Sequence, residues 1–138
     1  MLARYSMQRG RKFADYPRRV RAGTRQDTRK HTRHVLRPDA AIVNDYLAHP
    51  TEDAWSRFEK AYLAELTKRF DADRTAMDEL AALASTGDLY LGCSCPTPKN
   101  PDVRRCHTVL ALRFMQQRYP SLDVRFPHSE DVAPDPPS

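Results

Sequence analysis

Glycine, tryptophan and cysteine are scarce in this 138-residue sequence, which holds four, one and three of them. It has no Gly-rich phosphate loop, no G-x-S-x-G serine motif and no H-E-x-x-H zinc motif. Its apolar runs are too short to cross a bilayer, and the basic residues 1–12 lack the apolar core of a secretory signal. An odd cysteine count does not suit a secreted disulfide scaffold. We therefore expect a cytoplasmic protein with reduced thiols and no membrane partner.

Charge is unevenly distributed along the chain, whose net charge is +5. Residues 1–38 hold twelve Lys or Arg and two Asp, whereas the other hundred hold eleven basic and sixteen acidic residues. We expect a basic N-terminal arm at 1–37, with a possible first strand at Leu2–Met7 and a loop from Gln8 to Arg37. An α/β domain at 38–126 and a disordered, acidic, Pro-rich tail at 127–138 follow. The arm could bind nucleic acid through phosphate contacts, or remain solvated against the acidic body.

Three helices are predicted between residues 38 and 87. The first opens at Pro38 and Asp39 and ends at His49-Pro50. Thr51 is a suitable N-cap for the second, whose apolar side chains recur at spacings of three and four and indicate one core-facing stripe: Trp55, Phe58, Tyr62, Leu66 and Phe70. The third begins after Asp73 and stops at Gly87.

Two strands and a helix complete the predicted fold. Leu89–Cys93 is a short apolar run typical of a buried strand, Pro101–Tyr119 is predicted to be helical, and Leu122, Val124 and Phe126 alternate as in a strand. A strand, a helix and a strand at this spacing imply a parallel pair with a right-handed crossover. The expected fold is a single α/β domain in which helices cover a small, mostly parallel sheet. Ligands of such sheets bind beyond the carboxyl ends of the strands, the predicted position of residues 93–107.

All three cysteines lie in this segment, together with a histidine: Cys93, Cys95, Cys106 and His107. Three thiolates and one imidazole form a common zinc ligand set, although no C-x-x-C pair is present. Adjacent helical residues point about 100° apart, so Cys106 and His107 could share an ion only before the helix begins. The cysteines could equally be small buried fillers and the histidine a core residue.

An activated thiol is the leading interpretation of the same cluster. Cys106 or Cys93 would be the nucleophile or redox thiol and His107 its proton partner. An anionic substrate would be held by three basic side chains, Lys99, Arg104 and Arg105. A helix starting at Pro101 would place Cys106 in the second turn, where the helix dipole helps little.

The stretch from Arg37 to Tyr119 resembles a bacterial family known as domain of unknown function 488. Three features carry the resemblance: Leu36-Arg37-Pro38 opening a helix, the helical segment Trp55–Leu66, and the strand Leu89–Cys93 followed by the Cys106-His107 pair. The resemblance implies an α/β domain with Cys93, Cys106 and His107 in one shared site. Thr108 stands where many members have Arg, so an anion would be bound by Arg104, Arg105 or Arg113. The family's usual N-terminal strand motif is replaced by the basic arm.

Overall fold

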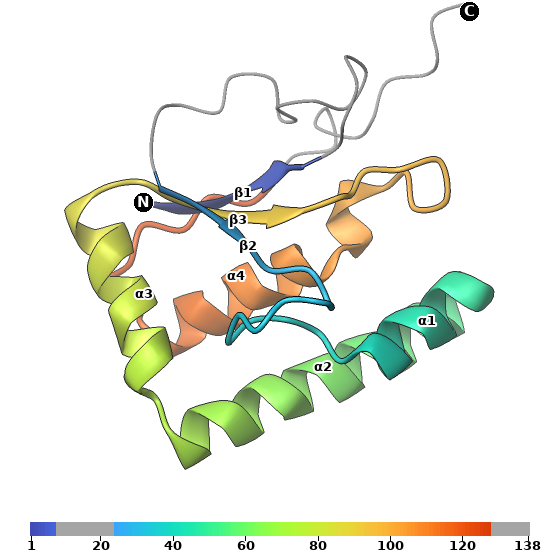
Figure 1. The fold of residues 1–138 in the computed structure, drawn as a ribbon, viewed down its shortest axis with the longest axis horizontal. Coiled ribbons are helices and arrows are strands. Elements are labelled where there is room, and N and C mark those ends of the chain that lie inside the picture. Colours follow the sequence, from blue (N-terminus) through green and yellow to red (C-terminus); the bar gives the residue numbers. More distant parts are fainter. Residues whose placement is uncertain (8–23, 128–138) are drawn as a thin grey trace, which may run out of the picture.

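A parallel three-stranded sheet lies at the centre of the computed structural model, which describes residues 1–7 and 24–127. The strands are β1 (Leu2–Ser6), β2 (Thr24–Asp27) and β3 (Leu89–Cys93), and β3 lies between the other two (Figure 1). Both outer strands run parallel to β3. The predicted fold class, a single α/β domain with a small parallel sheet, is confirmed.

Strand β2 corrects the sequence-based expectation for the basic segment. The loop predicted from Gln8 to Arg37 is wrong at Thr24–Asp27, which pair with β3 in the register Thr24↔Leu89. The prediction fails because this strand is entirely polar and shows no apolar alternation. Residues 8–23 of the predicted arm and residues 128–138 of the tail predicted at 127–138 lie outside the described residues.

Among residues 1–7 and 24–127, four helices form where the caps and apolar residues indicate them. They are α1 (Ala40–Ala48), α2 (Glu52–Ala72), α3 (Thr75–Thr86) and α4 (His107–Arg118). The Asp39 carboxylate accepts the N–H of Ala41 at 2.9 Å, and the Thr51 hydroxyl accepts that of Ala54 at 3.1 Å. Both residues therefore cap their helices, and the first three predicted helices are confirmed.

The helices form layers on one side of the sheet (Figure 1). Helix α4 packs against β1 and β3, and α2 packs on α4. The aromatic stripe of α2 faces this core, with Phe58, Tyr62 and Leu66 buried and Trp55 partly buried. Burial of each such side chain stabilises the fold by roughly 1.5–3 kcal/mol. Helix α2 therefore packs with this face toward the core.

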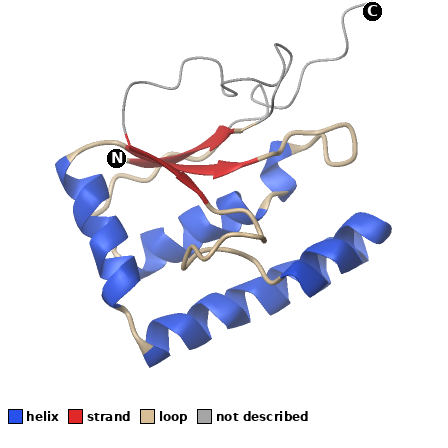
Figure 2. Cartoon of the chain, viewed as in Figure 1, coloured by secondary structure: helices blue, strands red, loops and turns tan. Residues whose placement is uncertain are grey.

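The connection from β2 to α1 is held against α2 by buried polar contacts (tan in Figure 2). The Tyr62 hydroxyl donates to the carbonyl of Leu36 at 2.6 Å. The Arg69 guanidinium donates to the carbonyls of Val35 at 2.9 Å and Arg37 at 2.6 Å. These bonds fix the path of the chain that leaves β2, and with it the residues that enter the site.

Two predicted elements near the C-terminus are shorter than expected. The helix predicted from Pro101 begins only at His107, because residues 103–105 form a separate 3-10 turn capped by Asp102. The final strand is reduced to one parallel bridge, Leu2↔Val124, at the edge beside β1. Within the described residues, no helix has the length and apolar character needed to span a membrane.

Candidate functional site

The site lies at the edge of the sheet where all three strands end. The register pairs Ser6 with Cys93 and Asp27 with Gly92, so the loops after β2 and β3 leave the sheet side by side. The N-terminus of α4 meets them there, and a pocket of about 310 Å³ opens between these segments, α1 and α2. This is the edge at which open parallel sheets bind ligands.

The three cysteine sulfurs gather at one wall of this pocket. The Sγ atoms of Cys93, Cys95 and Cys106 all lie within 4.8 Å of one another, and all three thiols are free. Cys93 and Cys106 are buried, whereas Cys95 is half-buried. Its sulfur accepts a hydrogen bond from the Asn100 amide at 3.2 Å. The loop between β3 and α4 thus brings distant cysteines into one cluster.

Cys106 occupies the N-cap position of α4, one residue before the helix begins. This position exposes its sulfur to the positive end of the helix dipole, which favours a thiolate. Burial acts the other way and raises the pKa of the Cys106 thiol. Hydrogen bonds from the Cys93 and Cys95 thiols and the positive imidazole outweigh burial, so the pKa lies well below its usual range. The Thr108 hydroxyl also donates to this sulfur at 3.2 Å.

His107 lies directly beside this sulfur and is 6% exposed. Its Nδ1 is 3.8 Å from Cys106 Sγ, and its Nε2 is 2.8 Å from Thr28 Oγ1. The Thr28 hydroxyl donates its one proton to the carbonyl of Gly92 at 3.0 Å, so it must accept from Nε2–H. Nδ1 is therefore the ring nitrogen that faces the Cys106 sulfur. Burial lowers the pKa of His107, but the negative charge of the neighbouring sulfurs raises it to about 10.

Arg4 of β1 lies behind the sulfurs and was not predicted as a site residue. It is 2% exposed, and its Nε donates to the Thr108 hydroxyl at 2.9 Å. Its Nη2 donates to the carbonyl of Cys95 at 2.5 Å. Nη1 is buried and has no hydrogen-bond partner in the part of the chain described. Thr108 therefore links a buried guanidinium to the sulfur of Cys106.

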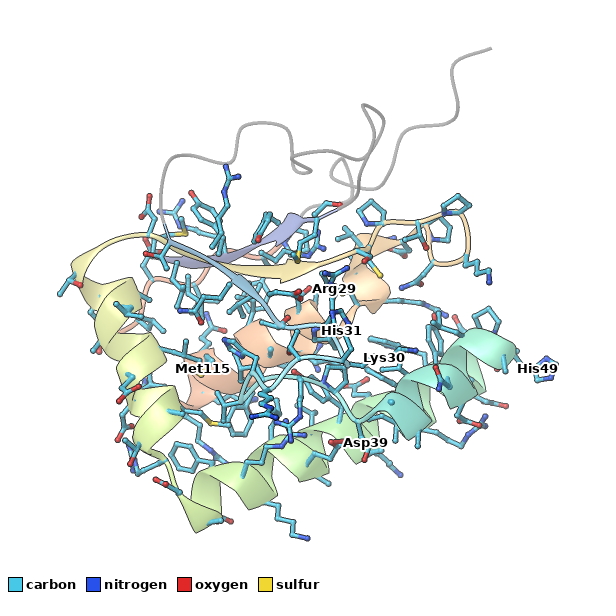
Figure 3. The ribbon with its side chains drawn as sticks, viewed as in Figure 1. Arg29, Lys30, His31, Asp39, His49 and Met115 are labelled. Atoms are coloured by element: carbon cyan, nitrogen blue, oxygen red, sulfur yellow. The ribbon has the colours of Figure 1, made fainter. Side chains whose placement is uncertain are left out.

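Basic side chains surround the mouth of the pocket. Of the predicted anion-binding residues, Lys99 and Arg105 line it, whereas Arg104 is turned away in an ion pair with Asp102. Three unpredicted basic residues of the β2–α1 loop also line it, and Figure 3 shows them between the sheet and α1: Arg29, Lys30 and His31. No acidic residue of the described chain lines this pocket. Its electrostatic character suits an anion.

A family model described as the active DUF488-N3 subclade matches residues 6–119. The chain belongs to the DUF488 family. Neither the curated proteins nor the solved structures contain a match to it. In this DUF488 chain the three residues that the resemblance placed in one site, Cys93, Cys106 and His107, do lie together. Thr108, the residue after this pair, accepts a hydrogen bond from Arg4 Nε at 2.9 Å.

Proposed function

We propose that this DUF488 protein is a thiol-dependent enzyme whose nucleophile is the Sγ of Cys106. The observation that carries the proposal is the position of this sulfur. It belongs to the N-cap residue of α4, lines the pocket and lies 3.8 Å from Nδ1 of His107. A cysteine paired with a histidine at a helix N-terminus is the arrangement that activates thiols in enzymes.

His107 acts as the proton partner of this thiolate. The sulfur donates an electron pair to an electrophilic atom of the substrate, and the bond from that atom to its leaving group breaks. The leaving group takes the proton from Nδ1 of His107. The neutral imidazole then deprotonates a water molecule, whose attack releases the second product and restores the thiolate. Thr28 keeps the ring in the orientation and tautomer that this cycle requires.

The substrate is anionic in this proposal. Lys99 and Arg105 line the pocket beside the sulfurs, together with the basic residues that follow β2. Buried Arg4 adds a positive charge behind the reacting atoms. Positive groups fixed around a site stabilise negative charge that develops in a transition state. The description of the matching family model as an active subclade agrees with a catalytic role.

Alkylation with iodoacetamide tests the nucleophile without knowledge of the substrate. We expect peptide mass spectrometry to find Cys106 modified first, with a midpoint well below about pH 8.5, the pKa of free cysteine. Cys106→Ser should abolish the fast phase, whereas Cys95→Ser should retain it. Fast modification of Cys93 instead, or three equally slow thiols at neutral pH, would contradict the assignment.

A structural zinc site is the second candidate, and the sulfur cluster is the observation that favours it. Zinc–sulfur bonds of about 2.3 Å place tetrahedral ligand sulfurs roughly 3.8 Å apart. The three Sγ atoms lie within 4.8 Å of one another, and Nδ1 of His107 is 3.8 Å from Cys106 Sγ. The three sulfurs supply three ligands, whereas the imidazole lies outside this group of atoms and would have to move to become the fourth. The Nε2–H of His107 already has an acceptor, as in many metal-bound histidines.

Elemental analysis of protein purified without chelators separates the two candidates. About one zinc per chain, with thiols that react only after chelation, would support the structural site and contradict the nucleophile. A metal-free protein with one fast thiol would support the enzyme. Circular dichroism before and after chelation adds a second readout, because a structural zinc contributes directly to folding.

A further inference from the structure

The pocket lining includes apolar side chains that the thiol chemistry does not require. Helices α1 and α2 supply these side chains, with Val43, Tyr46, Leu47, Trp55 and Phe58. Leu47 is 38% exposed, which makes it one of two exposed large hydrophobic side chains in the described chain. An exposed leucine beside aromatic rings in a concave site is typical of a ligand surface.

The tryptophan ring in this lining is held in a fixed orientation. It stacks on Phe58 with centroids 5.3 Å apart and an interplanar angle of 15°. The ring of Tyr46 meets it edge-on at 5.4 Å. Trp55 nevertheless remains partly exposed and lines the pocket. A fixed, partly exposed indole offers a flat surface for a planar group.

Basic side chains share the lining with these apolar ones. Lys99 is exposed, and Lys30 is exposed with its ammonium group 2.6 Å from the Asn44 amide oxygen. Arg29 is paired with Asp27, and Arg105 with Glu52, but neither carboxylate lines the pocket. A ligand with one anionic group and one flat apolar group would therefore meet complementary side chains for both groups in one pocket.

We propose that the substrate is a small aromatic phosphate ester, with its ring against Trp55 and its phosphate among the basic side chains. This inference rests on the proposed function and names the substrate class of the same site. The volume of about 310 Å³ lies at the lower end of small-molecule sites, which suits a ligand of one or two rings. Cys106 lines the same pocket and is the reacting group.

Binding can be followed directly, because Trp55 is the only tryptophan in the sequence. We expect uridine 5′-monophosphate and phenyl phosphate to change its fluorescence in the full-length Cys106→Ser protein, in which no turnover interferes. Uridine and inorganic phosphate should each bind at least about tenfold more weakly, because each meets only one of the two sets of side chains. A preference for the nucleotide over phenyl phosphate, or the reverse, identifies the source of the aromatic ring.

Two matched pairs of variants test the two sets of side chains. Lys99→Gln should weaken binding of uridine 5′-monophosphate roughly five- to tenfold, whereas Lys68→Gln on the exposed face of α2 should not. Leu47→Ser should weaken it, whereas Leu83→Ser, which is 44% exposed on α3 and outside the pocket, should not. Higher salt should weaken binding to the parent protein.

Several results would overturn the substrate class. One is that uridine binds as tightly as its monophosphate, or that inorganic phosphate binds as tightly as either ester. Another is that a single-stranded oligonucleotide binds while both esters fail to bind. A third is that no probe changes the fluorescence. Equal effects of Lys99→Gln and Lys68→Gln would also overturn it. None of these results alters the alkylation of Cys106 in the parent protein, so failure of the substrate class remains distinguishable from failure of the nucleophile.

Discussion

Replacing Thr28 by valine removes one hydroxyl group from the site and leaves the shape of the side chain nearly unchanged. The residue is fully buried, and its Oγ1 lies 2.8 Å from His107 Nε2 and 3.0 Å from the carbonyl of Gly92. The carbonyl keeps a second donor, because the backbone N–H of residue 28 also binds it at 3.0 Å. The substitution therefore leaves one orphaned group, the Nε2–H of the imidazole.

The size of the effect follows from that orphaned donor. An unsatisfied buried donor costs about 1–3 kcal/mol, and the cost is higher when the group is charged. We expect Thr28→Val to lower the free energy of unfolding by about this amount. The charged imidazole loses its acceptor, so the pKa of His107 should fall from its value of about 10. The neutral ring keeps its proton on the same nitrogen and also loses the acceptor, so the pKa falls only by the extra cost borne by the charged form.

The chemical consequence is that a smaller fraction of Cys106 is in the thiolate form at neutral pH. A less basic imidazole holds less positive charge beside the sulfur, so alkylation at about pH 7 should slow and its midpoint should move to higher pH. Urea denaturation measures the stability, and iodoacetamide alkylation across pH measures the thiol. Thr32→Val is the control, because the Thr32 hydroxyl binds the carbonyl of Arg29 at 2.7 Å and not the imidazole. A destabilised Thr28→Val protein with an unchanged alkylation profile would refute the tautomer argument.

Four further predictions concern the fold, its pH dependence and the basic segment. Gly92→Ala places a Cβ 2.7 Å from a methionine sulfur, so the urea midpoint should fall by the equivalent of about 1–3 kcal/mol; an unchanged midpoint would mean that the neighbour moves freely. Asp39→Ala removes the cap of α1 and should cost about 1 kcal/mol in the same assay; no loss would show that the cap is dispensable. The raised pKa of His107, about 10, gives stabilisation that is complete below about pH 6.5 and is lost as pH rises through about 10. The alkaline loss of stability should therefore be smaller in Cys106→Ser, and identical pH curves would argue against the ion pair. Replacing the six Lys and Arg of residues 8–23 by Gln should abolish any salt-sensitive binding to single-stranded DNA, and equal binding would exclude this segment as the contact.

The helices and the central strand were predictable because their apolar residues repeat with a clear period. The stripe on α2 and the caps at Asp39 and Thr51 each agree with the packing that forms. Strand β2 was not predictable on these grounds. Its four polar residues are held by backbone pairing to β3, and such pairing depends on a partner more than sixty residues away in the sequence.

The cysteines and the histidine of the site were predicted, but their partners were not. Thr28 and Arg4 lie far from residues 93–107 in the sequence, and only the fold brings them together. One signal was present for Arg4, because it shares the inward face of the first strand with Leu2 and is charged at a position that should be apolar. The start of α4 was placed too early, since the turn at Asp102 resembles a helix start in sequence.

The buried polar residues of the described chain give an independent argument for the site. There are six, in or just after β1 and β2, in the β3–α4 connection and at the start of α4: Arg4, Ser6, Thr28, Asn100, His107 and Thr108. Buried polar groups destabilise a fold unless they are bonded, and apolar residues would fill the same volume at lower cost. Four of these side chains bond to a cysteine or to the imidazole beside one. Concentrating such groups around three thiols, while the rest of the core stays apolar, is expected where the chemistry of a sulfur is being controlled.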